Sequence, residues 1–220
     1  MSADSLAQTL TAHIRSIADF ILLEEEGSQA DHAGAVITDA VLQAGLRYET
    51  VVAPRVRHVA AQYPQAQTLD GFLDVLTKHG ANVVLQWKGG RKPGLVLALT
   101  RFLVEEGNHT VEDLRNWIAS DDNARKLLAL HGVGPKTVDY LRLLLGIDTS
   151  AIDRHVLRFL REAGLDAPNY ATAKRIVDEM ADLLGLSRAR LDHSIWAYMA
   201  NRKPPRRETR QPLTRRKAEA

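Results

Sequence analysis

Leu-His-Gly-Val-Gly-Pro-Lys-Thr, at residues 130–137, is the stretch that decides the fold of this chain. Two glycines flank a single apolar residue, and glycine reaches backbone angles that cost other residues energy. Pro135 suits the first turn of a helix, where its missing N–H is not needed. Because residues 122–130 are expected to form a short helix, the pattern predicts two helices joined by a tight hairpin. The unpaired amides that open the second helix would receive an anion such as a DNA phosphate.

A second motif follows the hairpin, Ile-Asp-Arg-His-Val at residues 152–156. Together, Leu-x-Gly-Val-Gly-x-Lys-Thr and Ile-Asp-x-His-Val-x-x-x-Leu resemble the helix-hairpin-helix (HhH-GPD) DNA glycosylase superfamily, in particular its endonuclease III branch. The resemblance extends over about residues 46–201. It implies an all-α fold of two helical lobes with a central cleft, and it implies that Lys136 and Asp153 are catalytic.

The two implied catalytic residues match the chemistry of base removal from a flipped nucleotide. Asp153 would stabilise the positive charge that develops on the sugar, and the positive end of the helix after it favours its charged form. Lys136 would attack the sugar C1′ as a neutral amine, since a helix start and partial burial disfavour its ammonium form. The resulting Schiff base permits β-elimination. The pair therefore predicts a base excision repair DNA glycosylase with AP lyase activity.

Two other functions remain open at this point. In a non-catalytic helix-hairpin-helix DNA-binding module, Lys136 would contact phosphate and Asp153 would only cap a helix. The weaker third hypothesis is a protein-interaction domain that uses the same fold. The lesion is also undetermined, because an oxidised pyrimidine, 8-oxoguanine, an alkylated purine and a mismatched uracil or thymine all fit the motifs equally well.

Further site residues follow from the resemblance. The hairpin is expected to bind the DNA backbone through Gly132, Gly134, His131 and Thr137. A monovalent cation would also fit at the hairpin. Residues 191–196 stand where relatives line the base pocket, which makes candidates of Asp192, His193 and Trp196; Trp196 is alternatively a core residue.

A DNA wedge is expected near residue 48. Aligned by the Tyr-Pro at residues 63–64, residues 46–64 resemble the helix that carries the intercalating wedge in the endonuclease III branch. Tyr48 would stack on a base. Glu49 replaces a glutamine of that branch, and an ionised carboxylate can only accept hydrogen bonds. Alternatively, Tyr48 is half-buried packing and Glu49 is a surface charge.

Composition limits the function further. The 220 residues contain no cysteine, which excludes disulfides, thiol catalysis and the iron–sulfur cluster of many endonuclease III relatives. No cofactor is expected. Residues 202–220 hold eight Lys or Arg and two Glu, and we expect a basic, disordered tail there on a mildly acidic body. No apolar run is long enough for a membrane span. We expect a cytoplasmic, nucleoid-associated monomer that binds double-stranded DNA with a damaged base or an abasic site.

The apolar spacing indicates helices along almost the whole chain, without a strong alternating strand. We expect one two-lobed domain over residues 1–201. Its middle lobe would cover about residues 46–145, and residues 1–45 would join residues 146–201 in the other lobe. Thr110 with Asp113 resembles a capping box, and Asn169 is an expected helix cap.

Overall fold

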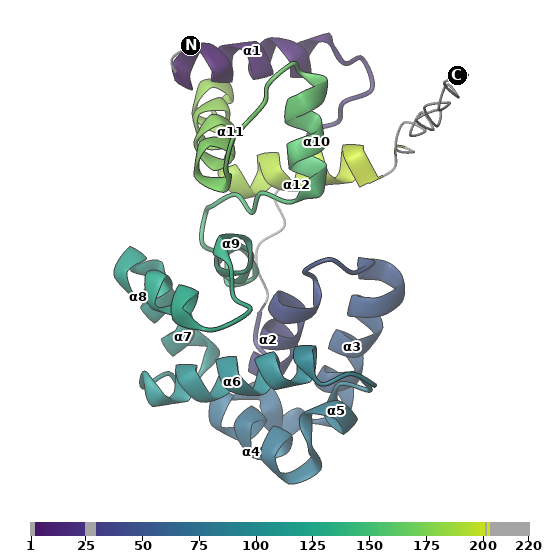
Figure 1. Ribbon diagram of the computed structural model, residues 1–220, viewed down its shortest axis with the longest axis vertical. Helices are drawn as coiled ribbons and strands as arrows, with labels where there is room; N and C mark the ends of the chain where they lie inside the picture. The colour runs from purple at the N-terminus through teal and green to yellow at the C-terminus, as the bar shows by residue number, and fades with distance from the viewer. Residues whose placement is uncertain (1–2, 25–29, 201, 203–220) are drawn as a thin grey trace, which may run out of the picture.

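The structure is a computed structural model that describes residues 3–24, 30–200 and 202. Within these ranges every regular element is helical, which confirms the all-α prediction (Figure 1). The helices are α1 (Ala3–Ser16), α2 (Ala33–Leu42), α3 (Ala53–Gln62), α4 (Leu69–His79), α5 (Ala81–Val84), α6 (Arg91–Glu105), α7 (Val111–Ala119), α8 (Asp121–Lys126), α9 (Pro135–Leu144), α10 (Arg154–Glu162), α11 (Tyr170–Leu184) and α12 (Arg188–Ala200). Short helical turns cover Tyr48–Val52, Pro64–Gln67 and Leu127–Ala129.

The helices form two lobes, each around its own core. α2 to α9 make the lower lobe of Figure 1, and α1 joins α10, α11 and α12 in the upper lobe. Phe72 and Leu114 are fully buried in the first core, and Leu10 and Phe159 in the second. The separate cores leave room for a site between the lobes.

The division of the chain differs from the expected one at α2. Nine of the ten residues of α2 are buried, and they pack in the core of the lower lobe. A Cβ on Gly34 would lie 2.8 Å from the Phe72 ring, so α2 and α4 approach closely there. A helix that is apolar on nearly all sides must lie in the centre of a lobe. Of the two N-terminal helices, therefore, only α1 packs with the C-terminal helices.

Local signals start several helices where the sequence predicts. Thr110 and Asp113 form the capping box of α7, and Asn169 Oδ1 accepts from the Thr172 amide at 2.9 Å, so both expected caps are confirmed. The apolar spacing of residues 4–23 predicts one helix to about residue 23, but α1 ends at Ser16. After Ser16 the chain turns and runs along α12, where Arg190 donates to the Leu23 carbonyl at 2.6 Å.

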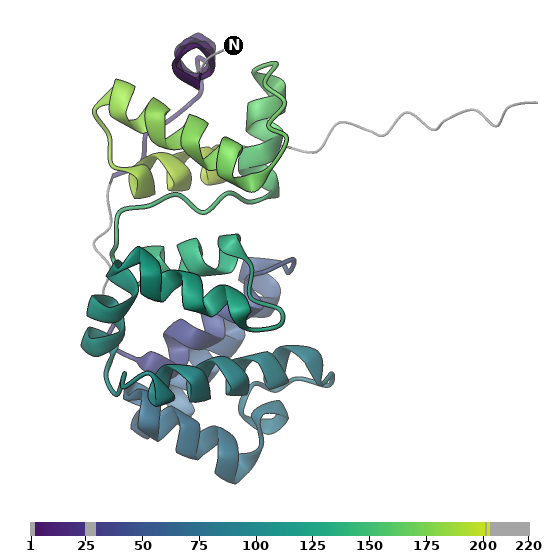
Figure 2. The same cartoon turned by 60° about the vertical axis from the view of Figure 1, so that its left-hand side comes forward.

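The segment between α9 and α10 joins the lobes and is fixed by buried polar groups. It crosses beneath the upper lobe before α10 begins (Figure 2). The Tyr170 hydroxyl donates to Asp139 Oδ2 at 2.7 Å and accepts from the Ile152 amide at 3.3 Å. Lys174 Nζ donates to the Thr149 hydroxyl at 2.6 Å. Tyr170 thus ties α9 to the residue that directly precedes Asp153.

We expect Tyr170→Phe to lower the free energy of unfolding by about 1–3 kcal/mol, because Asp139 Oδ2 loses its hydrogen-bond donor and the Ile152 amide loses its acceptor. Urea unfolding measures the loss. Tyr198→Phe is the matched control, since the Tyr198 hydroxyl has no hydrogen-bond partner in the described part of the chain, and its change should stay below about 0.5 kcal/mol. Equal losses in the two variants would contradict the bridging role.

Candidate active site

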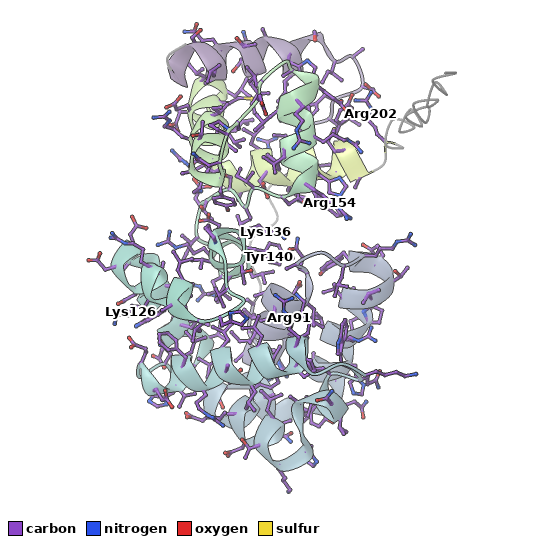
Figure 3. All side chains as sticks on the ribbon, in the orientation of Figure 1. Arg91, Lys126, Lys136, Tyr140, Arg154 and Arg202 are labelled. Carbon is purple, nitrogen blue, oxygen red and sulfur yellow. The ribbon has the colours of Figure 1, made fainter. Side chains whose placement is uncertain are left out.

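A cleft of about 1760 Å³ lies between the two lobes. The lower lobe lines it with the end of α2, residues 44–50 and α9, and the upper lobe lines it with residues 151–157 and α12. Figure 3 shows Lys136 and Tyr140 on the side of α9 that faces the upper lobe, and Arg154 at the near end of α10. Residues far apart in the sequence therefore share this cleft.

In the described ranges, no helix has both the length and the apolar character needed to cross a membrane.

The hairpin before Lys136 has the geometry that its glycines allow. Gly132 has φ +97°, and the Val133 amide donates to the Leu130 carbonyl at 3.0 Å. Gly134 is the N-cap of α9, and Pro135 occupies its first turn. The expected helix at 122–130 consists of α8 and one 3₁₀ turn. The hairpin thus opens α9 and fixes where Lys136 starts.

The four backbone-binding candidates of the hairpin differ in exposure. His131 and Gly132 are exposed, Gly134 is half-buried and Thr137 is buried. None of the four lines the cleft. The hairpin therefore presents its turn on the surface outside the cleft, with His131 and Gly132 accessible to a phosphate.

We expect Gly132→Ala to destabilise the protein by about 1–2 kcal/mol or more, because an L-residue at φ +97° is strained. Gly134→Ala is the matched control, since Gly134 has φ −115° and a Cβ there meets no atom within 4 Å. Thermal unfolding of the two variants measures the difference. A Gly134→Ala loss as large as that of Gly132→Ala would show that hairpin strain is not the cause.

Lys136 is half-buried, and its ammonium has few partners. Nζ donates to Gln43 Oε1 and lies 5.2 Å from the centre of the Tyr140 ring. Burial lowers the pKa of Lys136, and the charge of Lys92 lowers it further, while nearby carboxylates act in the opposite direction. The neutral amine is therefore more accessible here than on an exposed lysine.

Asp39 and two tyrosines form a hydrogen-bonded cluster near Lys136. The buried Asp39 carboxylate accepts from the Tyr48 hydroxyl at 3.1 Å and from the Tyr140 hydroxyl at 3.2 Å. Burial raises the pKa of Asp39 to about 6, against both hydrogen bonds and the charge of Lys136. Burial and the neighbouring Asp39 raise the pKa of Tyr48 to about 12. The cluster places a titratable carboxyl near the Lys136 amine, where the charges of the two groups act on each other.

Asp39 and Gln43 were missed by the sequence reasoning. They lie four residues apart, which places two polar side chains on one face of an otherwise apolar, Ala-rich helix. That spacing is the signal that could have identified them. Lys92 belongs to the same region, because its Nζ donates to the Val41 carbonyl at 2.6 Å and the Ala44 carbonyl at 3.2 Å.

Asp153 caps α10 from the opposite side of the cleft. Its Oδ1 accepts from the His155 amide at 2.7 Å and from the Val156 amide at 3.0 Å. These amides and the positive end of the helix complement a negative carboxylate. Asp153 lines the same cleft as Lys136, and its charge acts on the pKa of that lysine. The structure thus brings the two implied catalytic residues together.

The three base-pocket candidates all line the cleft from α12. Trp196 is half-buried, and its ring centre lies 6.1 Å from that of His193 and 6.5 Å from that of His155. Burial lowers the pKa of His155, although Asp153 opposes this change. Burial raises the pKa of Asp192 to about 8, and the charge of Asp153 contributes. On its upper side the cleft therefore combines aromatic faces with the carboxyl groups of Asp153 and Asp192.

The two wedge candidates lie at the rim of the cleft, in a π-helical turn. Tyr48 is half-buried, and its hydroxyl is bound to Asp39. Glu49 is exposed. Within the described residues the Glu49 side chain makes no hydrogen bond or ion pair, whereas Tyr48 would have to release Asp39 before it could enter DNA. In the described ranges, no group of three or more His, Asp or Glu side chains is arranged to hold a metal ion.

Comparisons with known proteins bear on the family and the fold of the chain. Residues 28–200 match the family described as Domain of unknown function (DUF8548). The chain is similar to the crystal structure of the H. pylori 3-methyladenine DNA glycosylase MagIII bound to 1,N6-ethenoadenine, with a TM-score of 0.61 and 13% identity over 91% of this chain and 96% of that one. For the Methanocaldococcus jannaschii 8-oxoguanine DNA glycosylase MjOgg, the TM-score is 0.49 at 15% identity, over 91% of this chain and 87% of that one. The chain thus belongs to the DUF8548 family, and its fold is that of the helix-hairpin-helix DNA glycosylases.

Proposed function

We propose that this protein is a base excision repair DNA glycosylase with AP lyase activity. One observation carries the proposal: Lys136 and Asp153 line one cleft between the two lobes. The cleft has room for an extruded nucleotide. The lowered pKa of Lys136 favours the neutral amine that a nucleophile requires.

In the proposed reaction the Lys136 amine attacks C1′ of a flipped nucleotide while the bond from C1′ to the base breaks. Asp153 stabilises the positive charge on the sugar in the transition state. Loss of a proton from the attached nitrogen and opening of the sugar ring give a Schiff base. Removal of a C2′ proton then expels the 3′ phosphate by β-elimination. Water finally hydrolyses the imine and returns Lys136.

The proposed substrate is double-stranded DNA with a damaged base or an abasic site. The exposed turn of the hairpin, at His131 and Gly132, would contact the phosphate backbone outside the cleft. A monovalent cation at the hairpin would assist this contact, and the reaction needs no other cofactor. We propose that the protein acts as a monomer on chromosomal DNA in the cytoplasm.

Two assays on the full chain test the proposal. Borohydride trapping on a duplex with an abasic site should give a covalent protein–DNA adduct. A release assay over duplexes with oxidised, alkylated, mismatched and etheno bases should identify at least one excised base. Duplex binding without an adduct or a released base would instead support a DNA-binding module, and absence of binding would support a protein-interaction domain.

A further inference from the structure

Asp192 holds a buried oxygen that the fold does not satisfy. It lies on α12 and lines the cleft, yet its Oδ1 is shielded from solvent and has no hydrogen-bond partner within the described residues. An ionised carboxylate needs donors for both oxygens when it is buried. A protonated carboxyl carries no charge, so burying its oxygen without a donor costs less free energy than burying a carboxylate oxygen. The geometry alone therefore favours the neutral acid.

The neighbours of Asp192 have opposing effects on its protonation. Burial and the negative charge of Asp153 favour the neutral acid and raise the pKa of Asp192 to about 8, whereas Lys136, Lys174 and the Ala151 amide favour the carboxylate. Asp192 also lies near enough to two phenols, Tyr140 of α9 and Tyr170 of α11, for its charge to act on their pKa values. A carboxyl oxygen without a partner beside a carboxylate whose oxygen is held by two backbone amides has the arrangement of an acid and an electrostatic partner.

We propose that Asp192 is the proton carrier of this site, and that it protonates the departing base while Asp153 remains the charged partner of the sugar. The proposal rests on the proposed glycosylase function and adds a third catalytic residue to it. Asp153 is less suited to the role because its Oδ1 is held by two amides. Asp39 is less suited because each of its oxygens accepts from a tyrosine.

The proposed step balances in protons and electrons. The Lys136 nitrogen forms a bond to C1′, and the electrons of the bond from C1′ to the base go to the departing nitrogen. That nitrogen takes the proton of Asp192, so the base leaves neutral. The Asp192 carboxylate then accepts the proton that the attached Lys136 nitrogen loses. The carboxyl is thus restored before the Schiff base forms.

This role also selects a class of substrate. A base that is neutral in DNA leaves as an anion unless an acid protonates it. A purine alkylated on a ring nitrogen is already cationic, and it leaves neutral without any acid. A buried proton donor therefore fits the removal of neutral damaged bases, and it contributes nothing to the departure of cationic ones.

Asp192→Asn is the test, since asparagine keeps the size and one acceptor oxygen but carries no transferable proton. We expect excision of a neutral lesion to fall about a hundredfold or more at pH 7. Cleavage of a preformed abasic site should stay within about threefold of wild type, because no base departs there and solvent water can accept the proton that the attached Lys136 nitrogen loses. Asp166→Asn is the control, because Asp166 is exposed and lies outside the cleft, and it should match wild type in both assays.

The pH profile separates this role from a structural one. Asp192 keeps its proton below about pH 8 and loses it above, so wild-type excision should decline as the pH rises through 8. Asp192→Asn should lack that decline. ¹³C NMR of the aspartate carboxyls, assigned by the missing resonance of the variant, should show one group that titrates near 8.

The outcomes distinguish the two proposals. Excision by wild type together with normal excision by Asp192→Asn overturns the proton carrier alone, and so does an Asp192 carboxyl that titrates below pH 5. Absence of any excision or adduct in wild type overturns the glycosylase function and this role with it.

Discussion

Replacing Lys136 with glutamine is expected to abolish the borohydride-trapped adduct with abasic DNA and to slow β-elimination about a thousandfold or more. Glutamine retains hydrogen-bonding capacity but has no nucleophilic amine. Its shorter side chain fits a site where the lysine is half-buried beside Gln43 and the Tyr140 ring. Gel electrophoresis of the trapped complex measures the adduct, and strand cleavage of the same duplex measures the rate.

Lys136→Arg distinguishes a nucleophile from a phosphate contact. Arginine keeps the positive charge, so duplex binding should stay near wild type while the adduct is still lost. Lys88→Gln is the control for a general loss of charge, because Lys88 is exposed on the loop before α6 and should leave the adduct unchanged. An adduct that persists in Lys136→Gln would mean that another amine is the nucleophile.

Asp153→Asn is expected to lower base excision about a hundredfold to a thousandfold, the range found when one preorganised electrostatic group is removed. The negative charge that faces the sugar is lost. The fold should be affected little, since asparagine caps helices about as well as aspartate and its oxygen can still accept from the amides of residues 155 and 156. Release of the lesion base under single-turnover conditions measures the effect.

The matched control is Asp113→Asn in the capping box of α7. Asp113 accepts backbone hydrogen bonds at a helix start, as Asp153 does, but it does not line the cleft. Its substitution should leave excision unchanged. If both variants lose stability equally and excision follows stability, Asp153 is a structural cap and not a catalytic residue.

The sequence predicted the helical class, the hairpin and several helix starts because these depend on neighbouring residues. Gly132 allows a positive φ within one turn, and Thr110 and Asp113 form their box over four residues. The limits of α1 were less predictable, since the chain leaves the helix after Ser16 to pair with Arg190 on α12. The apolar spacing of residues 4–23 contains no information about that distant partner.

The sequence by itself determined which residues carry chemistry: an amine directly after a glycine hairpin and a carboxyl at the start of a later helix. Only the tertiary structure decided what surrounds them. It placed α2 in the lower lobe, which brings Gln43 and Asp39 to Lys136, and it shielded Asp192 Oδ1 from solvent in the cleft that this lysine lines. The reason is physical, because caps and turns arise from short-range backbone bonds, whereas burial and the pKa of a side chain depend on groups that only packing brings together.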